Sequence, residues 1–294
     1  MQTEKFDSFF QGNARTYLMD AINLALTEDG PDLTSEGIFP PGHKLSAQII
    51  SKEETLVVGL PLIPLIMDAC AKSEWEWNAR VAEGDLVADR TVVATLEADA
   101  SHLLKAERII LNFITHLSGI ANLTKRYADE LKGTGTRLLD TRKTLPCLRY
   151  PEKYAVLMGG GLNHRKDLTE ILMLKDNHID LAGNMTAAVN KLRATYDPCP
   201  PVEVECRTME EVHEAVACRA DRIMLDNMDI PAIREALKHI PEFIETEASG
   251  GVTLDTIRSI ALASELGPDY ISVGRLTHSA PIADFSMLVN ESGE

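Results

Sequence analysis

The stretch at 202–227, VEVECRTMEEVHEAVACRADRIMLDN, contains the pattern that decides the fold. It reads as a short apolar strand at 202–205, an amphipathic helix at 209–218 and a second apolar strand at 222–225. The segment between the strands is long enough for a helix to bring the chain back to the start of the next strand, which parallel pairing requires. The stretch therefore predicts a βαβ unit of a parallel sheet.

The same alternation of strand and helix extends over the chain after Gly133. Further strands are predicted at 137–140, 171–174, 243–247 and 270–273, and further helices at 185–195, 231–239 and 254–265. A series of βαβ units of this kind closes into a barrel or forms a doubly wound sheet. An α/β domain with a parallel sheet is therefore expected here.

The residues before Gly133 follow a different pattern. A helix is predicted at 15–26, short strands at 44–51, 55–58, 75–80 and 91–96, and a long helical stretch at 101–132. Ser118-Gly119 is expected to break the long stretch into two helices. This part of the chain predicts a small α+β domain with an antiparallel sheet.

The composition is that of a globular protein and excludes several classes of function. Of the 294 residues, 45% are apolar and 25% are charged, which excludes disorder as the main state. The formal net charge of -16 disfavours a general nucleic-acid or anionic-membrane surface. The longest apolar run, 56–67, is too short for a bilayer span, and the N-terminus lacks the pattern of a secretory signal. A cytoplasmic location is expected.

Basic residues gather just after the predicted strands, where parallel α/β folds bind ligands. Residues 137–178 hold eight Lys or Arg against five Asp or Glu, in a chain that is otherwise acidic. Solvated surface charge would explain any one of these residues. A local positive site explains the group better, and its side chains suit a ligand with several anionic groups. The candidate residues are Arg142, Lys143, His164, Arg165 and Lys175.

Two acidic residues, Glu205 and Asp226, end neighbouring predicted strands. Strand alternation places Glu203 and Glu205 on the same side, which in a closed barrel is the interior or its mouth. A carboxylate in such a place must be paired, bind a metal or accept hydrogen bonds from ligand hydroxyls. Salt bridges to the basic residues are the alternative interpretation.

A glycine-rich turn, Ser249-Gly250-Gly251, lies between a predicted strand and a predicted helix. Its backbone amides could converge on a phosphate at the helix N-terminus. The alternative is a turn whose glycines only permit positive φ angles. Together with Gly274 after the last strand, the turn is similar to the phosphate site that late strands of α/β barrels often form.

These motifs together resemble the quinolinate phosphoribosyltransferase family, also called the carboxylating nicotinate-nucleotide pyrophosphorylases. The motifs are DTRKT at 140–144, NHR at 163–165, KDNH at 175–178, VEVE at 202–205, LDN at 225–227, EASGG at 247–251 and SVG at 272–274. The resemblance implies an N-terminal α+β sandwich domain at 1–117 and an incomplete α/β barrel, like that of type II phosphoribosyltransferases, at 118–275. It also implies that the C-terminal segment, 276–294, packs back on the first domain.

The resemblance implies an activity as well. Members of the family transfer phosphoribosyl from phosphoribosyl pyrophosphate to quinolinate with decarboxylation. The products are nicotinate mononucleotide, pyrophosphate and carbon dioxide, and the reaction belongs to NAD biosynthesis. Mg²⁺ is the implied cofactor. A homodimer with active sites shared between subunits is implied too.

Residue roles are carried over only where this chain matches the family motifs. Quinolinate would be held by Arg108, Arg142, His164, Arg165 and Lys175, with Arg108 entering from the neighbouring subunit. Lys143, Glu205 and Asp226 would act on the phosphoribosyl donor, and the two carboxylates would help to place magnesium. The phosphate would be bound by Ser249, Gly250, Gly251 and Gly274, while the role of Arg275 is left open.

Two other functions are compatible with parts of this pattern. Lys175 could be the Schiff-base lysine of a barrel aldolase or decarboxylase, because a buried lysine beside other cations is often neutral. This alternative leaves the other cations unexplained. The chain could also be a phosphosugar-binding homologue that kept the barrel and lost the chemistry.

Overall fold

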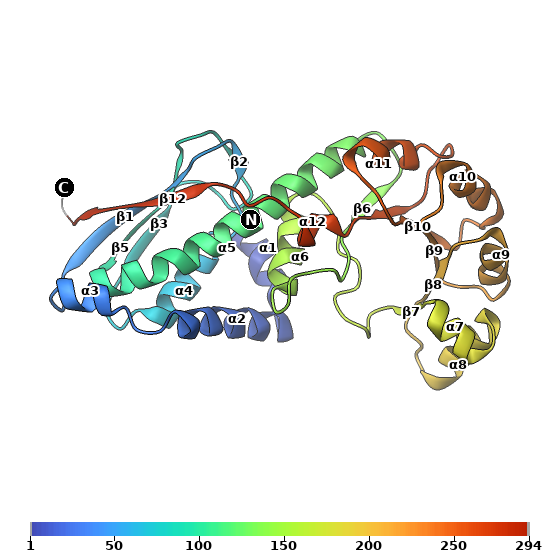
Figure 1. Ribbon diagram of the computed structural model, residues 1–294, viewed down its shortest axis with the longest axis horizontal. Coiled ribbons are helices and arrows are strands. Elements are labelled where there is room, and N and C mark those ends of the chain that lie inside the picture. Colours follow the sequence, from blue (N-terminus) through green and yellow to red (C-terminus); the bar gives the residue numbers. More distant parts are fainter. Residues whose placement is uncertain (1, 293–294) are drawn as a thin grey trace. The chain divides into compact units, whose positions relative to one another are not determined.

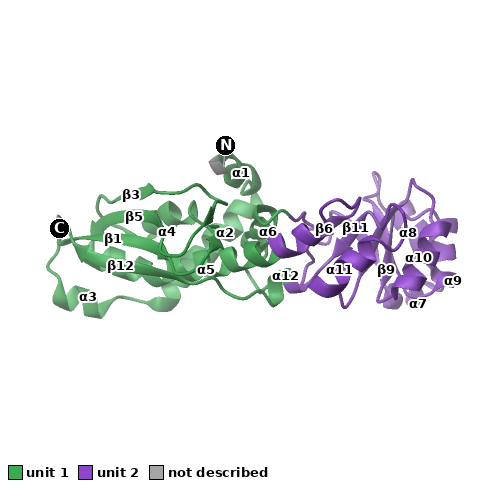
Figure 2. Ribbon diagram, turned by 90° about the horizontal axis from the view of Figure 1, so that it is seen from above, with its two compact units in different colours: residues 1–124, 144–160, 276–294 green, residues 125–143, 161–275 purple. Residues whose placement is uncertain are grey.

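The chain divides into two compact units in the computed structural model, which describes residues 2–292 (Figure 2). Within that range the first unit comprises the N-terminal part up to Thr124, residues 144–160 and the C-terminal part from Leu276, and the second comprises 125–143 and 161–275. The predicted barrel domain, 118–275, included 144–160, and the structure differs there. Tyr154 packs on Phe6 and Phe10, with ring centroids 5.5 and 5.4 Å apart, and ties this segment to the first unit.

A four-stranded antiparallel sheet lies at the centre of the first unit, in the order β12-β1-β5-β3. Alternate residues of β1, Leu45, Ala47 and Ile49, are buried, so one face of the strand packs into the core. The C-terminal segment takes part in this sheet through β12. The strands are β1 (Lys44–Ser51), β3 (Glu76–Ala79), β5 (Val92–Asp99) and β12 (Phe285–Glu291). A separate two-stranded antiparallel sheet is formed by β2 (Thr55–Leu56) and β4 (Leu86–Val87).

The long helix α5 (Ala100–Glu130) is continuous, so the predicted break at Ser118-Gly119 is wrong. Both residues are needed for close packing: the Ser118 hydroxyl accepts a hydrogen bond from the amide of Val58 at 3.0 Å, and a Cβ on Gly119 would overlap the carbonyl oxygen of Pro281. In the described range no helix has the length and apolar character of a membrane span. The other helices outside the barrel are α1 (Gln2–Phe9), α2 (Asn13–Asp29), α3 (Leu33–Ile38), α4 (Leu62–Cys70), α6 (Arg149–Met158) and α12 (Arg275–His278).

The second unit is a six-stranded parallel sheet in the order β6-β11-β10-β9-β8-β7. Across the described residues, no ladder joins the edge strands β6 and β7, and the barrel is incomplete as predicted. The helices lie along one side of the strands (Figure 1). The strands are β6 (Arg137–Leu139), β7 (Leu172–Leu174), β8 (Val202–Cys206), β9 (Arg222–Asp226), β10 (Glu245–Ser249) and β11 (Tyr270–Ser272). The helices are α7 (Asp176–Ala182), α8 (Met185–Thr195), α9 (Met209–Ala217), α10 (Ile230–His239) and α11 (Leu254–Ala261).

Strand β10 begins two residues later than predicted. Phe243, the first residue of the predicted strand, is 73% exposed, and the amide of Ile244 closes a turn by donating to the carbonyl of Pro241 at 3.0 Å. The shift matters for the site, because the parallel register then pairs Ser249 with Asp226 at the ends of β10 and β9.

Candidate active site

A cavity of about 460 Å³ opens at the carboxyl ends of the parallel strands, within the second unit. It is lined by cations from the segments after β6 and β7, by carboxylates of β8, β9 and β10, and by two serines of β10 and β11. This arrangement is the one that the strand-end rule predicts. The lining residues are Thr141, Arg142, Lys143, His164, Arg165, Met173, Lys175, Glu205, Met224, Asp226, Asn227, Glu247, Ser249 and Ser272.

Two guanidinium groups, those of Arg142 and Arg165, face this cavity. Arg165 is only 8% exposed, and burial together with the charge of Arg142 lowers its pKa. The buried Nε of Arg142 has no hydrogen-bond partner among the described residues. Buried polar atoms are nearly always paired, and two like charges held together are stabilised by an anion between them. The pair therefore fits a ligand with two carboxylates.

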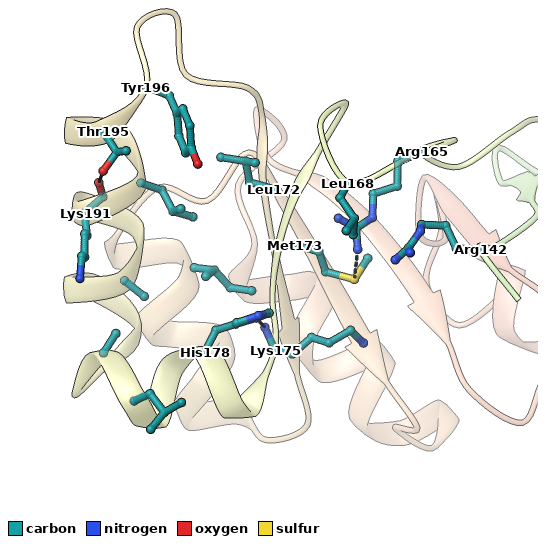
Figure 3. A pocket seen from close by; sticks show the side chains of 15 residues that line it. Arg142, Arg165, Leu168, Leu172, Met173, Lys175, His178, Lys191, Thr195 and Tyr196 are labelled. Atoms are coloured by element: carbon teal, nitrogen blue, oxygen red, sulfur yellow. Dashed lines mark hydrogen bonds between the residues drawn. The ribbon is translucent and has the colours of Figure 1, made fainter. Parts of the chain in front are cut away.

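The backbone that carries Arg165 is fixed by buried groups. Asp140, which directly follows β6, accepts a hydrogen bond from the amide of His164 at 2.8 Å and another from the side chain of Asn163 at 2.7 Å. The Arg165 guanidinium donates to the carbonyl of Ile171 at 2.8 Å and lies 3.6 Å from the Met173 sulfur (Figure 3). The side chain is thus held in one orientation before it meets any ligand.

His164 uses both ring nitrogens within the protein. Its Nε2 lies 3.2 Å from Glu203 Oε2 and 3.3 Å from Glu247 Oε2, and both carboxylates are fully buried. Its Nδ1 accepts a hydrogen bond from the Arg165 amide at 2.7 Å. His164 therefore lines the cavity, as predicted for a residue beside quinolinate, but its polar atoms hold Arg165 and the two carboxylates.

The protons of this cluster follow from the same geometry. Burial lowers the pKa of His164, but the carboxylates of Glu203 and Glu247 outweigh it and raise that pKa to about 9. A second ring proton would have to sit on Nδ1, which already accepts the Arg165 N–H. We therefore assign one proton to the ring, on Nε2. The second proton that the cluster holds is assigned to Glu203, whose pKa is raised by burial and by the charge of Glu247.

The contacts of His164, Glu203 and Glu247 indicate a hydrogen-bonded and ion-paired cluster, not a metal site. One ligand atom each from His164, Glu203 and Glu247 lies within 4.8 Å of the others, which is a spacing that a cation could use. However, Arg222 Nη1 already lies 3.6 Å from Glu247, and the imidazole lies at hydrogen-bond distance from both acids. A further cation would face the Arg222 guanidinium and the Nε2–H of His164 directly.

Glu205 and Asp226, the predicted donor residues, lie side by side at the ends of β8 and β9. Lys175 Nζ is 2.7 Å from Glu205 Oε2. Burial acts to raise the pKa of Glu205, but Lys175 and Arg207 outweigh it and bring that pKa below its usual value. Burial and the charge of Glu205 raise the pKa of Asp226. The two neighbouring carboxylates of this acidic pair thus differ in acidity, because the pKa of Glu205 is lowered and that of Asp226 is raised.

Arg207 is a charged residue of the site that sequence reasoning missed. It lies 3.2 Å from Glu205 Oε1, 3.0 Å from Asp176 and 3.6 Å from Asp226. The signal that could have found it is its position two residues after Glu205, just beyond the strand end. The salt bridges that were the alternative interpretation of the two carboxylates are therefore present.

The predicted phosphate residues occupy neighbouring strand ends. The Ser249 hydroxyl accepts a hydrogen bond from that of Ser272 at 2.9 Å, and both serines line the cavity. Gly250 and Gly251 follow β10 with φ angles of 94° and 61°, and a Cβ on Gly250 would overlap the Asn227 side chain. Gly274 follows β11. Only glycine fits the close approach at 250.

Two of the residues singled out in the sequence, Arg108 and Arg275, are not among the residues that line the cavity. Arg108 is an exposed residue of α5 and belongs to the first unit, whereas all the lining residues belong to the second. Arg275 is exposed at the start of α12. Lys143 lines the cavity and is exposed.

A second cavity, of about 640 Å³, shares Arg142, Arg165 and Lys175 with the first (Figure 3). Its remaining walls are mainly apolar side chains of β7, α7 and α8.

Lys175 is half-exposed and its ammonium is paired with Glu205, which stabilises the charged amine. Schiff-base chemistry needs a neutral amine, so this geometry disfavours the aldolase alternative.

The fold and the site together define a class: an incomplete α/β barrel enzyme that binds anionic ligands at the carboxyl ends of its strands. Comparison with known proteins narrows the class. The model of the quinolinate phosphoribosyl transferase C-terminal domain matches residues 120–288, and that of the N-terminal domain matches residues 32–118. The chain belongs to the quinolinate phosphoribosyltransferase family, which confirms the resemblance seen in the sequence.

Individual relatives agree with the family models. A probable carboxylating nicotinate-nucleotide pyrophosphorylase of Bacillus subtilis is 40% identical over 266 residues, covering 90% of this chain and 89% of the relative. One from Synechocystis is 40% identical over 250 residues, covering 84% and 83%. The crystal structure of NadC from Streptococcus pyogenes is 36% identical with a TM-score of 0.86, covering 92% and 95% of the two chains.

Proposed function

We propose that this cavity binds quinolinate and phosphoribosyl pyrophosphate side by side and joins them. Family membership makes the chain an enzyme, a quinolinate phosphoribosyltransferase of NAD biosynthesis, as the sequence predicted. It forms nicotinate mononucleotide and releases pyrophosphate and carbon dioxide. The observation that carries the proposal is the pair formed by the buried Arg165 and the half-buried Arg142, whose buried Nε has no partner among the described residues; the pair matches a diacid and would be costly without one.

The part of the cavity that binds quinolinate, the acceptor side, consists of Arg142, Arg165 and Lys175. His164 supports it through the hydrogen bond that its Nδ1 accepts from the Arg165 amide. Arginine can grip a planar carboxylate through two parallel hydrogen bonds, and the pair of guanidiniums suits the adjacent carboxylates of quinolinate. The buried Nε of Arg142 offers a donor that the described protein does not use. Nicotinate, with one carboxylate, would leave a cation without its partner.

The donor side consists of the acidic pair and the glycine-rich turn. Glu205 and Asp226 accept hydrogen bonds from the ribose hydroxyls, while Lys143 is shared with the acceptor side. The phosphate group of the donor is bound by Ser249 and by the backbone around Gly250, Gly251 and Gly274, where amides at a strand end precede helix α11.

The chemistry is a displacement at the anomeric carbon of the donor. The pyridine nitrogen of quinolinate forms the new C–N bond as the bond to pyrophosphate breaks. Anionic Glu205 and Asp226 stabilise the positive charge that develops on the ribose, a contribution of about 3 to 4 kcal/mol. The carboxylate next to the quaternised nitrogen then leaves as carbon dioxide, and the carbanion left on the ring takes a proton. The protein positions the ring and excludes water.

Magnesium fits the donor side, because carboxylate oxygens are the ligands it prefers in proteins. Glu205 and Asp226 would hold it, directly or through water, and it would neutralise charge on the leaving pyrophosphate. The cytoplasmic location expected from the sequence stays a prediction.

The proposal includes a homodimer in which Arg108 of one subunit completes the site of the other. Its support is the exposed position of Arg108 on α5, in a unit separate from the cavity. The family match of the helix that carries it, noted in the sequence, is the second support.

A product assay tests the function. Purified protein, quinolinate, phosphoribosyl pyrophosphate and Mg²⁺ should yield nicotinate mononucleotide, measured by chromatography. With nicotinate in place of quinolinate, we expect a rate at least about 100-fold lower, because a buried cation is left unpaired. Binding of both substrates without any product would contradict the proposal and favour the phosphosugar-binding alternative.

Mixing two inactive variants tests the shared site. Arg108→Ala and Arg142→Ala should each abolish turnover without unfolding the protein. In a dimer with shared sites, re-equilibrating equal amounts of the two should restore about one quarter of wild-type activity, because half of the dimers are mixed and each has one intact site. Activity in Arg108→Ala alone, or no recovery in the mixture, would rule out the shared site.

A further inference from the structure

Arg207 joins three carboxylates that come from three different elements. Its Nη2 lies 3.0 Å from Asp176 at the start of α7 and 3.2 Å from Glu205 at the end of β8. Its Nε lies 3.6 Å from Asp226 at the end of β9. The planar guanidinium fork allows one side chain to meet several acceptors in fixed directions, which a lysine ammonium on a flexible chain does less well.

The arginine contacts the acidic pair from outside the cavity. Glu205 and Asp226 line the cavity and expose only 9% and 16% of their side chains, whereas Arg207 is 49% exposed and, in the range that the structure describes, is not among the lining residues. An exposed ion pair by itself contributes little to stability. What Arg207 contributes here is the orientation of two carboxylates that are themselves mostly buried.

Without this cation the acidic pair would be poorly ordered. Two carboxylates at neighbouring strand ends repel each other, and a cation between them removes the repulsion. Lys175 contacts Oε2 of Glu205, so Arg207 is what holds the other oxygen. Besides Arg207, Asp226 contacts the Asn227 side chain at 3.0 Å and the Glu205 carboxylate, but no second cation among the described residues. Loss of Arg207 would therefore free Asp226 more than Glu205.

We propose that Arg207 is a positioning residue for the phosphoribosyl donor, which orients Glu205 and Asp226 toward the ribose hydroxyls without contacting the donor itself. This inference rests on the proposed function. It also predicts an effect on one substrate only. Arg165 is held by other groups, the Ile171 carbonyl, the Met173 sulfur and the His164 ring, and the three ion pairs of Arg207 involve neither Arg142 nor Arg165.

Separate binding measurements on the two sides of the cavity test the inference. The donor probe is phosphoribosyl pyrophosphate with Mg²⁺, and the acceptor probe is phthalate, which has two adjacent carboxylates and no ring nitrogen to react. By calorimetry, Arg207→Gln should weaken donor binding about tenfold or more, the size expected for lost charge-assisted hydrogen bonds. Phthalate binding should stay within about twofold of wild type. Arg207→Lys should recover part of the donor affinity, since it keeps the charge and loses the fork.

Arg193→Gln is the matched control. Arg193 also lies in the second unit, pairs with one carboxylate, Asp221, at 3.5 Å and donates to the carbonyl of Cys218, away from the cavity. This variant should bind both probes as wild type does. Steady-state kinetics should show the same division, with a higher KM for the donor and an unchanged KM for quinolinate in Arg207→Gln.

Two outcomes would overturn the inference alone: an active wild type with Arg207→Gln binding the donor equally well, or Arg207→Gln losing both probes to the same extent, which indicates a general structural role. A wild-type protein that binds neither probe and forms no nicotinate mononucleotide would overturn the proposed function, and the inference with it.

Discussion

Buried carboxylates occur in both units, but they are neutralised in different ways. Glu83, in the first unit, accepts hydrogen bonds from the amides of Gly59 and Leu60 at 2.8 and 2.9 Å and from the Tyr154 hydroxyl at 3.1 Å. Glu203 and Glu247, in the second unit, face the ring of His164, and Arg222 lies 3.6 Å from Glu247. The first arrangement uses neutral donors only, whereas the second adds the charged guanidinium of Arg222.

The difference shows what each set of carboxylates does. Two successive backbone amides and the Tyr154 hydroxyl fix Glu83 beside the start of α4 and need no ligand nearby. Glu203 and Glu247 contact His164, whose Nδ1 bonds the Arg165 amide, so their negative charge lies near the cationic pair of the cavity and offsets the repulsion between the guanidiniums. A buried acid satisfied by backbone amides thus supports the fold, whereas acids satisfied by a histidine and an arginine support a binding site.

Removing one of the charged acids should have the largest effect. Glu247→Ala removes a fully buried carboxylate that contacts the buried His164 and the Arg222 guanidinium, so we expect the free energy of unfolding to fall by about 3 to 5 kcal/mol. Urea unfolding followed by far-UV circular dichroism measures it. Glu235→Ala, which removes an exposed partner of Lys238 on α10, is the control and should leave the free energy of unfolding nearly unchanged. Equal losses in the two variants would show that the buried cluster is no more important than a surface pair.

A smaller and pH-dependent effect is expected at Glu83. Burial raises its pKa from 4.5 to about 7, although the hydrogen bonds from Gly59, Leu60 and Tyr154 act in the other direction. Between these values the folded protein holds a proton that the unfolded chain has lost. The free energy of unfolding should therefore be highest below pH about 4.5, as far as this group is concerned, and fall by about 3 kcal/mol as the pH rises to about 7.

Glu83→Gln should remove this slope, because the amide does not titrate. Urea unfolding at pH 5 and pH 8, followed by tryptophan fluorescence, measures the change in the free energy of unfolding. The signal reports on the first unit, because both tryptophans of the chain, Trp75 and Trp77, lie in it. Glu97→Gln, an exposed position on β5, should keep the wild-type slope. If the free energy of unfolding of Glu83→Gln depends on pH as that of the wild type does, then Glu83 is already ionised at pH 5 in the folded protein. That result would contradict the raised pKa of Glu83.

The parallel sheet was predictable because its strands are short apolar runs separated by amphipathic helices. The helices α4 and α6 were not predicted, although each lies in the stretch of chain that was analysed. Both contain a proline in the first turn, Pro64 in α4 and Pro151 in α6. A proline there costs no hydrogen bond, so a feature that usually marks a helix break marks a helix start. Strand β10 was misplaced because the apolar Phe243 is exposed.

The site was predictable where a residue lies at the carboxyl end of a strand or within three residues after it, as Arg142, Lys175, Glu205 and Asp226 do. The carboxyl ends of parallel strands meet at one edge, so proximity along that edge can be read from the sequence. The role of His164 could not be read in the same way. Its contact with Glu247 depends on the register of β8, β9 and β10, which brings together residues far apart in the chain.

The sequence by itself determined the alternation of strands and helices after Gly133, the concentration of basic residues between 137 and 178 and the family motifs, because these depend on neighbouring residues and their periodicity. Only the tertiary structure decided which charges meet: Arg207 with three carboxylates, and His164 with two buried acids. Ion pairs form between side chains that the fold brings within about 4 Å, and that distance is set by strand register and packing, which a linear pattern does not contain.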